Sequence, residues 1–147
     1  MKTMLATAIA FASEKHKGQF DKAGMPYILH PLTVMGYLDT DDLELMCIGV
    51  LHDVVEDCGV TFDDLRAIGM SERVVVGAKG MTKVPGESVG EQFARLTQNL
   101  DIIKTKLADL RHNMDPRRMK GVSPKDQARN DAYSRLYWKL KPLASLA

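Results

Sequence analysis

The sequence predicts an all-α fold in a single domain. Apolar residues recur at helical spacing through most of the 147 residues, and helix-capping residues stand before the expected helices. No useful length of sequence shows the apolar–polar alternation that is typical of a half-buried strand. Glycine and proline gather only in short connections, and there is no repeat or low-complexity tract, so no domain boundary is indicated.

An amphipathic helix is expected first, over residues 3–16, with Leu5 and Ile9 on its apolar stripe. Its apolar part also resembles a short secretory signal, but the amphipathic pattern favours a helix of the folded domain. A polar loop is expected at 17–27. The second helix is expected to start at His30-Pro31, because proline suits the first helical turn, and to run to about residue 38.

The most apolar helix is expected over residues 43–58, as one continuous element. Asp41 and Asp42 can cap its N-terminus, and Gly59 can end it. It is apolar nearly all the way round before His52, which is typical of a buried helix.

The second half of the chain is expected to contain further helices, each opened by a capping residue. They are predicted over residues 61–67, 71–79, 88–96, 100–114 and 123–141. Thr61 and Asp64 have the spacing of a capping box, and Asp115-Pro116 should end the fourth of these helices.

Composition argues against several classes of function. The net charge is +1 with 27% charged residues, and no basic stripe indicates a nucleic-acid binder. No segment has the length needed to cross a membrane. The two cysteines, Cys47 and Cys58, are expected to be reduced core thiols in a cytoplasmic protein. The expected partner is therefore a small molecule, and the oligomeric state is not indicated.

Ionisable residues gather at the end of the buried helix, in the segment 51–57 (Leu-His-Asp-Val-Val-Glu-Asp). On a continuous helix His52, Asp53, Glu56 and Asp57 would share one side. Buried ionised groups are costly unless they are paired or bind a metal, and the nearest cationic residue along the chain is Arg66. The segment therefore predicts a metal site, with satisfied helix-end polar groups as the alternative.

Two other segments carry polar residues that a core would not favour. His30 stands in Pro-Tyr-Ile-Leu-His-Pro, and Asp109 lies four residues before Asn113 in a strongly helical segment. Taken alone, His30 could be a turn residue and Asp109 could form a surface pair with an arginine or lysine. Together with His52 and Asp53 they would form a two-histidine, two-aspartate site that suits Mn, Fe, Zn, Ni or Co better than Mg or Ca. Four protein ligands would leave coordination positions open, as in a catalytic site.

In this order the segments resemble the HD-domain metal-dependent phosphohydrolases, and among them the hydrolase domain of the RelA/SpoT proteins and the small alarmone hydrolases. The similarity extends from about residue 6 to 113, with a weaker match at Ala132-Tyr133. The matching pieces are Ala8…Phe11-Ala12…His16-Lys17-Gly18-Gln19, Gly24-Met25-Pro26-Tyr27-Ile28-Leu29-His30-Pro31, Leu51-His52-Asp53-Val54-Val55-Glu56-Asp57, Met81-Thr82-Lys83 and Lys106-Leu107-Ala108-Asp109…His112-Asn113-Met114.

The resemblance implies an HD-type helical bundle that binds one divalent ion, typically Mn²⁺. It implies removal of the 3′-pyrophosphate of the alarmones ppGpp or pppGpp, the nucleotides of the stringent response. We expect no synthetase domain, so that the chain would only degrade them. The implied metal ligands are His30, His52, Asp53 and Asp109, the catalytic acids are Glu56 and Asp57, and the substrate contacts include Asn113 and Tyr133. Cations are needed for the pyrophosphate, and the candidates are Lys22, Lys83 and Arg111, with His16 and Lys17 behind them.

Two departures leave the substrate open. Asp21 stands where the family usually has an arginine that stacks on the guanine base, and Leu110 stands where arginine is common. Loss of a cation that can stack on a π-face should weaken or redirect base recognition. An adenosine alarmone therefore remains possible. The alternatives are a phosphatase of the same fold acting on a nucleoside monophosphate, a dNTP or NADPH, and a non-catalytic nucleotide sensor, which would not need both Glu56 and Asp57.

Overall fold

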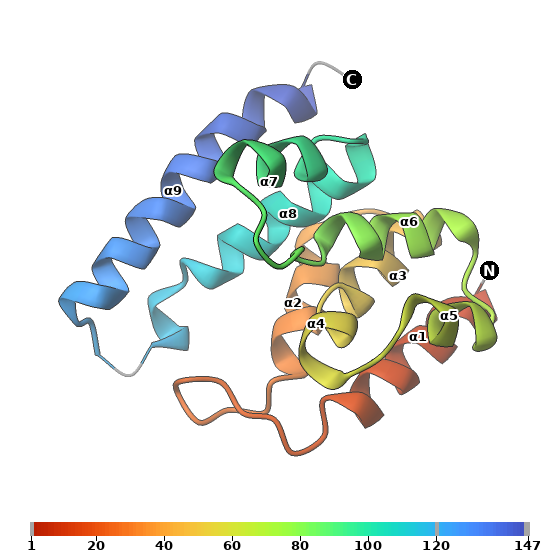
Figure 1. Cartoon of the computed structure of the whole chain (residues 1–147). Helices are drawn as coiled ribbons and strands as arrows, with labels where there is room; N and C mark the ends of the chain where they lie inside the picture. The colour runs from red at the N-terminus through yellow and green to blue at the C-terminus, as the bar shows by residue number, and fades with distance from the viewer. Residues whose placement is uncertain (1, 120, 146–147) are drawn as a thin grey trace.

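The computed structural model describes residues 2–119 and 121–145, which form nine α-helices and one 3₁₀ turn (Figure 1). Within these residues the backbone forms no strand, only an isolated bridge between Phe20 and Pro26, so the all-α prediction is confirmed. The elements are α1 (Lys2–Lys15), α2 (Leu29–Tyr37), α3 (Leu43–Leu51), α4 (Val54–Cys58), α5 (Phe62–Ala67), α6 (Glu72–Met81), α7 (Val89–Leu96), α8 (Leu100–Asn113), the 3₁₀ turn η1 (Pro116–Arg118) and α9 (Pro124–Ser145).

Most helices begin at the capping residue that the sequence indicated. The side chain of Asp42 accepts from the Leu45 amide, and Thr61 and Asp64 form the reciprocal capping box. Each such bond satisfies an amide that has no partner inside its own helix. Ser71, Ser88 and Asn99 cap α6, α7 and α8 in the same way.

The prediction of one continuous helix over residues 43–58 is wrong. The chain leaves helical geometry at Asp53, with φ −107° and ψ −7°, which separates α3 from α4. The His52 Nδ1–H donates to the Gly49 carbonyl at 2.7 Å, the oxygen that the Asp53 amide would reach in an unbroken helix. The His-Asp pair and the following acids therefore do not share one helical face.

The last helix also differs from its prediction, because α9 continues through Pro142 to Ser145 instead of ending near residue 141. Proline removes a hydrogen bond within a helix. Leu143 and Ala144 pack against the buried cluster of α8 and α9, and this burial offsets the loss. Although α9 is long, no helix of the described residues is both long and apolar enough to cross a bilayer.

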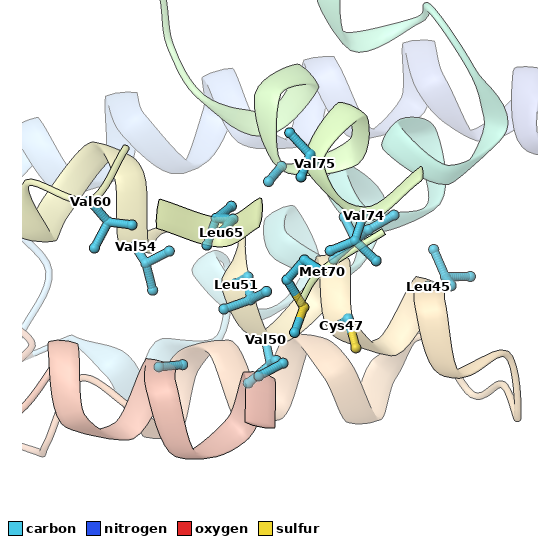
Figure 2. Packing of buried hydrophobic residues seen from close by; sticks show 14 residues of the cluster. Leu45, Cys47, Val50, Leu51, Val54, Val60, Leu65, Met70, Val74 and Val75 are labelled. Carbon is cyan, nitrogen blue, oxygen red and sulfur yellow. The ribbon is translucent and has the colours of Figure 1, made fainter. Parts of the chain in front are cut away.

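The hydrophobic core surrounds α3, in which six of the nine residues are buried. Figure 2 shows its side chains together with those of neighbouring helices, among them Val54, Leu65 and Val74. A second apolar cluster joins α8 to α9, which lie side by side in Figure 1. Helix α8 also contacts α2, α3 and α6, so it connects the two clusters.

Helix α6 packs closely against α3 and α8 because two of its positions lack a side chain. A Cβ atom at Gly77 would overlap Ile48 of α3, and one at Gly80 would overlap Ile102 of α8. This close packing fixes the C-terminal end of α6, where the chain passes into Thr82 and Lys83.

One arginine links three helices at their ends. Arg73 of α6 pairs with Asp42 at 2.6 Å, with Glu44 at 3.0 Å and with Asp101 at 2.9 Å. We expect Arg73→Ala to lower the free energy of unfolding by about 1–3 kcal/mol, because it leaves three carboxylates facing one another. Chemical denaturation of the variant and of the wild type measures this difference.

A control and a pH series make this prediction specific. Arg66 forms only exposed pairs with Asp63 and Glu72, so Arg66→Ala should cost less than about 1 kcal/mol. The Arg73 guanidinium lowers the pKa of Asp42, so this pair stabilises the fold above pH about 4 and less as the pH falls through that value. A stability difference that does not shrink in acid would contradict an electrostatic origin.

Candidate active site

Four ionisable groups from three regions of the fold converge at the centre of the molecule. His30 comes from α2, His52 and Asp53 from the break between α3 and α4, and Asp109 from α8. His30 Nε2 lies 2.9 Å from Asp109 Oδ1 and 3.5 Å from Asp53 Oδ2. His52 Nε2 lies 3.0 Å from Asp53 Oδ2 and 3.3 Å from Asp109 Oδ1. One ligand atom each from His30, His52 and Asp109 falls within 4.8 Å of the others, so this buried group could hold a metal ion.

The orientation of His52 fits a metal ligand. Its Nδ1–H donates to the Gly49 carbonyl, so Nε2 is the ring nitrogen that faces Asp53 and Asp109. That nitrogen is buried and has no hydrogen-bond partner among the described residues. Burial alone would lower the pKa of His52, but the two carboxylates outweigh it and raise the pKa well above its ordinary value. The site therefore stabilises positive charge at this nitrogen.

A third histidine, His112, orients His30, and the sequence analysis did not predict this role for it. His112 Nδ1 lies 2.7 Å from His30 Nδ1, and the two rings stack with centroids 5.0 Å apart. Burial, followed by the charges of His30 and Arg118, lowers the pKa of His112 to about 4. His112 is thus neutral near pH 7, and one of the two Nδ1 atoms donates to the other. His30 Nε2 faces the carboxylates and is hydrogen-bonded to Asp109 Oδ1 at 2.9 Å.

Tyr27 and Lys106 hold the two aspartates through hydrogen bonds. The sequence analysis did not predict this role for Tyr27. The Tyr27 hydroxyl donates to Asp53 Oδ2 at 2.8 Å. Lys106 Nζ donates to Asp109 Oδ2 at 2.9 Å. Burial would raise the pKa of Asp109, but Lys106 and the imidazoles hold it well below its usual range. Asp109 thus does pair with a lysine, but the pair is buried and coexists with the cluster, unlike the surface pair considered as the alternative.

A cleft of about 350 Å³ opens onto the four groups. Its wall includes four of the residues expected to contact substrate, namely Lys22, Lys83, Asn113 and Tyr133. Asn113 also donates to Asp109 Oδ1 at 3.1 Å, which ties it to the cluster. The cleft is thus lined by cations and polar groups and ends at a carboxylate–imidazole centre.

The two acids of the expected catalytic pair face different surroundings. Glu56 lines the cleft, and its Oε1 accepts from the Lys83 amide at 2.9 Å. Asp57 is turned toward Gln19, whose amide donates to its Oδ2 at 3.3 Å. Burial, followed by the charge of Asp53, raises the pKa of Asp57. His16 lies behind this pair, buried and hydrogen-bonded to the Gln19 side chain at 2.8 Å.

The prediction that Arg111 is a cation of the substrate site is wrong. The Arg111 guanidinium stacks on Tyr37, 3.9 Å from the ring centre, and lines a separate pocket between α8 and the C-terminal part of α9. On α8, residue 111 is about 200° round the axis from residue 109, so its side chain leaves on the opposite face.

The chain is similar to known proteins in sequence and in fold. No family model matches the chain. It is 32% identical over 139 residues to a probable guanosine-3′,5′-bis(diphosphate) 3′-pyrophosphohydrolase of Synechocystis, covering 86% of this chain and 18% of that protein. It is 36% identical over 122 residues to the Vibrio cholerae protein named guanosine-3′,5′-bis(diphosphate) 3′-pyrophosphohydrolase, covering 75% and 17%. A GTP pyrophosphokinase of Myxococcus xanthus is 33% identical over 141 residues, covering 86% and 18%.

The chain thus spans less than a fifth of the length of these relatives. A solved structure, described as a metazoan ortholog of SpoT that hydrolyses ppGpp, superposes with a TM-score of 0.79 at 19% identity, over 93% of this chain and 84% of that one. The fold and the site therefore define an all-helical bundle of the HD type, with its histidines and aspartates gathered at one centre. Within that class, the chain is a relative of the hydrolase domain of the RelA/SpoT proteins.

Proposed function

We propose that these residues act as one hydrolase domain, a metal-dependent enzyme that removes the 3′-pyrophosphate from a guanosine or adenosine alarmone such as (p)ppGpp. The observation that carries the proposal is the convergence of two imidazoles and two carboxylates at the base of a cleft whose wall includes Glu56 and several cations. The names of the relatives support the substrate class.

In this proposal His30, His52, Asp53 and Asp109 hold one divalent ion, most suitably Mn²⁺. Mixed nitrogen and oxygen donors suit such an ion, and the Nε2 atoms of both histidines are turned toward the carboxylates. A divalent ion bound there would lower the pKa of a water molecule and offset charge on a phosphoryl oxygen. Tyr27 and Lys106 would keep the two aspartates in the orientation that binding requires.

Glu56 takes the proton of the attacking water. The Lys83 amide holds its Oε1, which leaves Oε2 for the water. Asp57 acts less directly, because its carboxylate is bound to Gln19, and its raised pKa suits a proton store beside Glu56. Lys22 and Lys83 neutralise the leaving pyrophosphate, while Asn113 and Tyr133 contact the nucleoside.

The proposed location is the cytoplasm. Cys47 and Cys58 are both free, which suits a reducing compartment.

Product analysis tests the reaction. The protein is incubated with Mn²⁺ and, separately, with ppGpp, ppApp and NADPH, and the products are identified by ion-exchange chromatography. Pyrophosphate together with GDP or ADP is the expected result. Release of orthophosphate from NADPH alone would instead identify a phosphatase, and binding of alarmone without turnover would identify a sensor.

Asp21 bears on which base is preferred. Its Oδ1 accepts from the amides of Ala23 and Met25, each at 2.9 Å, so this carboxylate shapes the loop at the mouth of the cleft. Replacement by arginine would supply a planar cation that can stack on a base. We expect Asp21→Arg to raise the ratio of kcat/KM for ppGpp over ppApp about 2- to 5-fold.

The matched control is Asp21→Asn, which keeps an acceptor oxygen for the loop, removes the negative charge and introduces no cation. Its ratio of guanine to adenine activity should equal that of the wild type. If Asp21→Arg also leaves this ratio unchanged, another residue reads the base.

A further inference from the structure

Arg118 enters the cleft from a segment in which no sequence pattern indicated a functional residue. It ends η1, the 3₁₀ turn that follows α8, and its side chain lines the same cleft as Glu56 and Lys83. The guanidinium carbon lies 6.0 Å from the ring centre of Tyr27, the residue that holds Asp53.

The charge of Arg118 has no anionic partner in the part of the chain that the structure describes. Its Nη1 donates to the Asn113 side-chain oxygen, while Nε is buried and makes no hydrogen bond to any described residue. Two other cations of the cleft are paired, since Lys106 binds Asp109 at 2.9 Å and Lys22 lies 3.6 Å from Asp126. A buried guanidinium donor without a partner is unfavourable, and an anionic ligand would satisfy it.

Asn113 fixes this guanidinium relative to the metal-binding cluster. Its Nδ2 donates to Asp109 Oδ1 at 3.1 Å, and its Oδ1 accepts from Arg118. The amide therefore bridges the two groups, which places the cation beside the cluster and leaves its remaining donors available to a ligand. Asn113 thereby acts as a positioning residue for Arg118.

We propose that Arg118 binds the phosphoryl oxygens of the substrate's pyrophosphate group, at the edge of the cleft next to the metal ligands. This inference rests on the proposed function and adds a residue to it. A planar guanidinium can donate two parallel hydrogen bonds to a phosphate, which a lysine cannot do. The site therefore favours a substrate whose phosphoryl oxygens lie beside the metal-binding cluster.

The neighbouring arginine provides a matched control. The Arg117 side chain is 86% exposed, pairs with Asp115 at 2.7 Å and is not part of the cleft lining. Binding of inorganic pyrophosphate is measured by calorimetry, at a fixed concentration of free Mn²⁺, for the wild type, Arg118→Met, Arg118→Lys and Arg117→Met, and binding of ppGpp is measured for the same set in the slow Glu56→Gln background. We expect Arg118→Met to weaken both ligands about 10- to 100-fold, Arg118→Lys to weaken them less, and Arg117→Met to leave them unchanged.

Bound Mn²⁺ and the far-UV circular dichroism of each variant separate anion binding from damage to the fold or to the metal site. Both should match the wild type in Arg118→Met. If that variant does not fold, Arg118→Lys decides, since the loss of two-point binding should still weaken pyrophosphate measurably while the metal content stays normal.

Pyrophosphate binding within twofold of the wild type in Arg118→Met, or an equal loss in Arg117→Met, would overturn the inference. These outcomes are distinct from a failure of the proposed function, in which the wild type releases no pyrophosphate from any alarmone, because the binding measurements do not depend on turnover.

Discussion

Asp53→Asn is expected to reduce hydrolysis by about 10³-fold or more and to remove most of the bound metal. Asp53 Oδ2 lies within 3.5 Å of the Nε2 atoms of both histidines, so its negative charge faces the position that a cation would take. The amide keeps the size of the carboxylate and can still accept from Tyr27, which limits the change to the lost charge. Metal content after gel filtration and initial rates with ppGpp measure the two effects.

The control for this substitution is Asp63→Asn, which changes a carboxylate that is 91% exposed on α5. It should bind metal and turn over substrate like the wild type. Asp53→Asn protein that keeps a full complement of Mn²⁺ would show that Asp53 is not a ligand, whatever its activity.

Glu56→Gln is expected to separate catalysis from metal binding. It should lower kcat about 10²- to 10⁴-fold, the range contributed by a general base, while the metal content stays at the wild-type level. The glutamine oxygen can still accept from the Lys83 amide, so the loop between α6 and α7 should keep its position. Single-turnover kinetics and metal analysis on the same preparation check both statements.

Glu14→Gln serves as the comparison, because Glu14 is exposed on α1 and does not line the cleft. Its kcat should be unchanged. Unimpaired turnover by Glu56→Gln would transfer the role of the base to Asp57, and simultaneous loss of metal would place Glu56 among the ligands instead.

The helices and the central cluster could be predicted because both depend on local patterns. Capping residues such as Thr61 and Asn99 mark helix starts through bonds to amides three residues later, and these are readable in sequence. His30, the His52-Asp53 pair and Asp109 stood out because a core accepts such groups only when they are compensated.

The break at Asp53 could not be predicted, because it depends on a hydrogen bond between the His52 ring and the backbone, and no propensity reports such a bond. His112 was missed for a related reason, since its contact with His30 joins residues 82 positions apart. Lys106 was within reach of sequence reasoning, because a lysine three residues before Asp109 lies on the same helical face. The same spacing argues against Arg111, because a residue two positions after Asp109 lies on the opposite face of the helix.

Arg118 could not be predicted for another reason. It follows Asp115-Pro116 in a short irregular stretch, where no periodicity tells which side chain turns inward. The tertiary structure brings Arg118 into the cleft and leaves Arg117 beside it in solvent.

The close approach of α6 to its neighbours limits how this protein could be engineered. Replacing helical glycine by alanine is a common way to raise thermal tolerance, because it reduces the disorder of the unfolded chain. At Gly77 and Gly80 the added methyl group would push α6 away from Ile48 and Ile102. That displacement would carry Lys83, and with it the amide that holds Glu56, away from the reaction centre. Stabilising substitutions should therefore be made elsewhere in the chain.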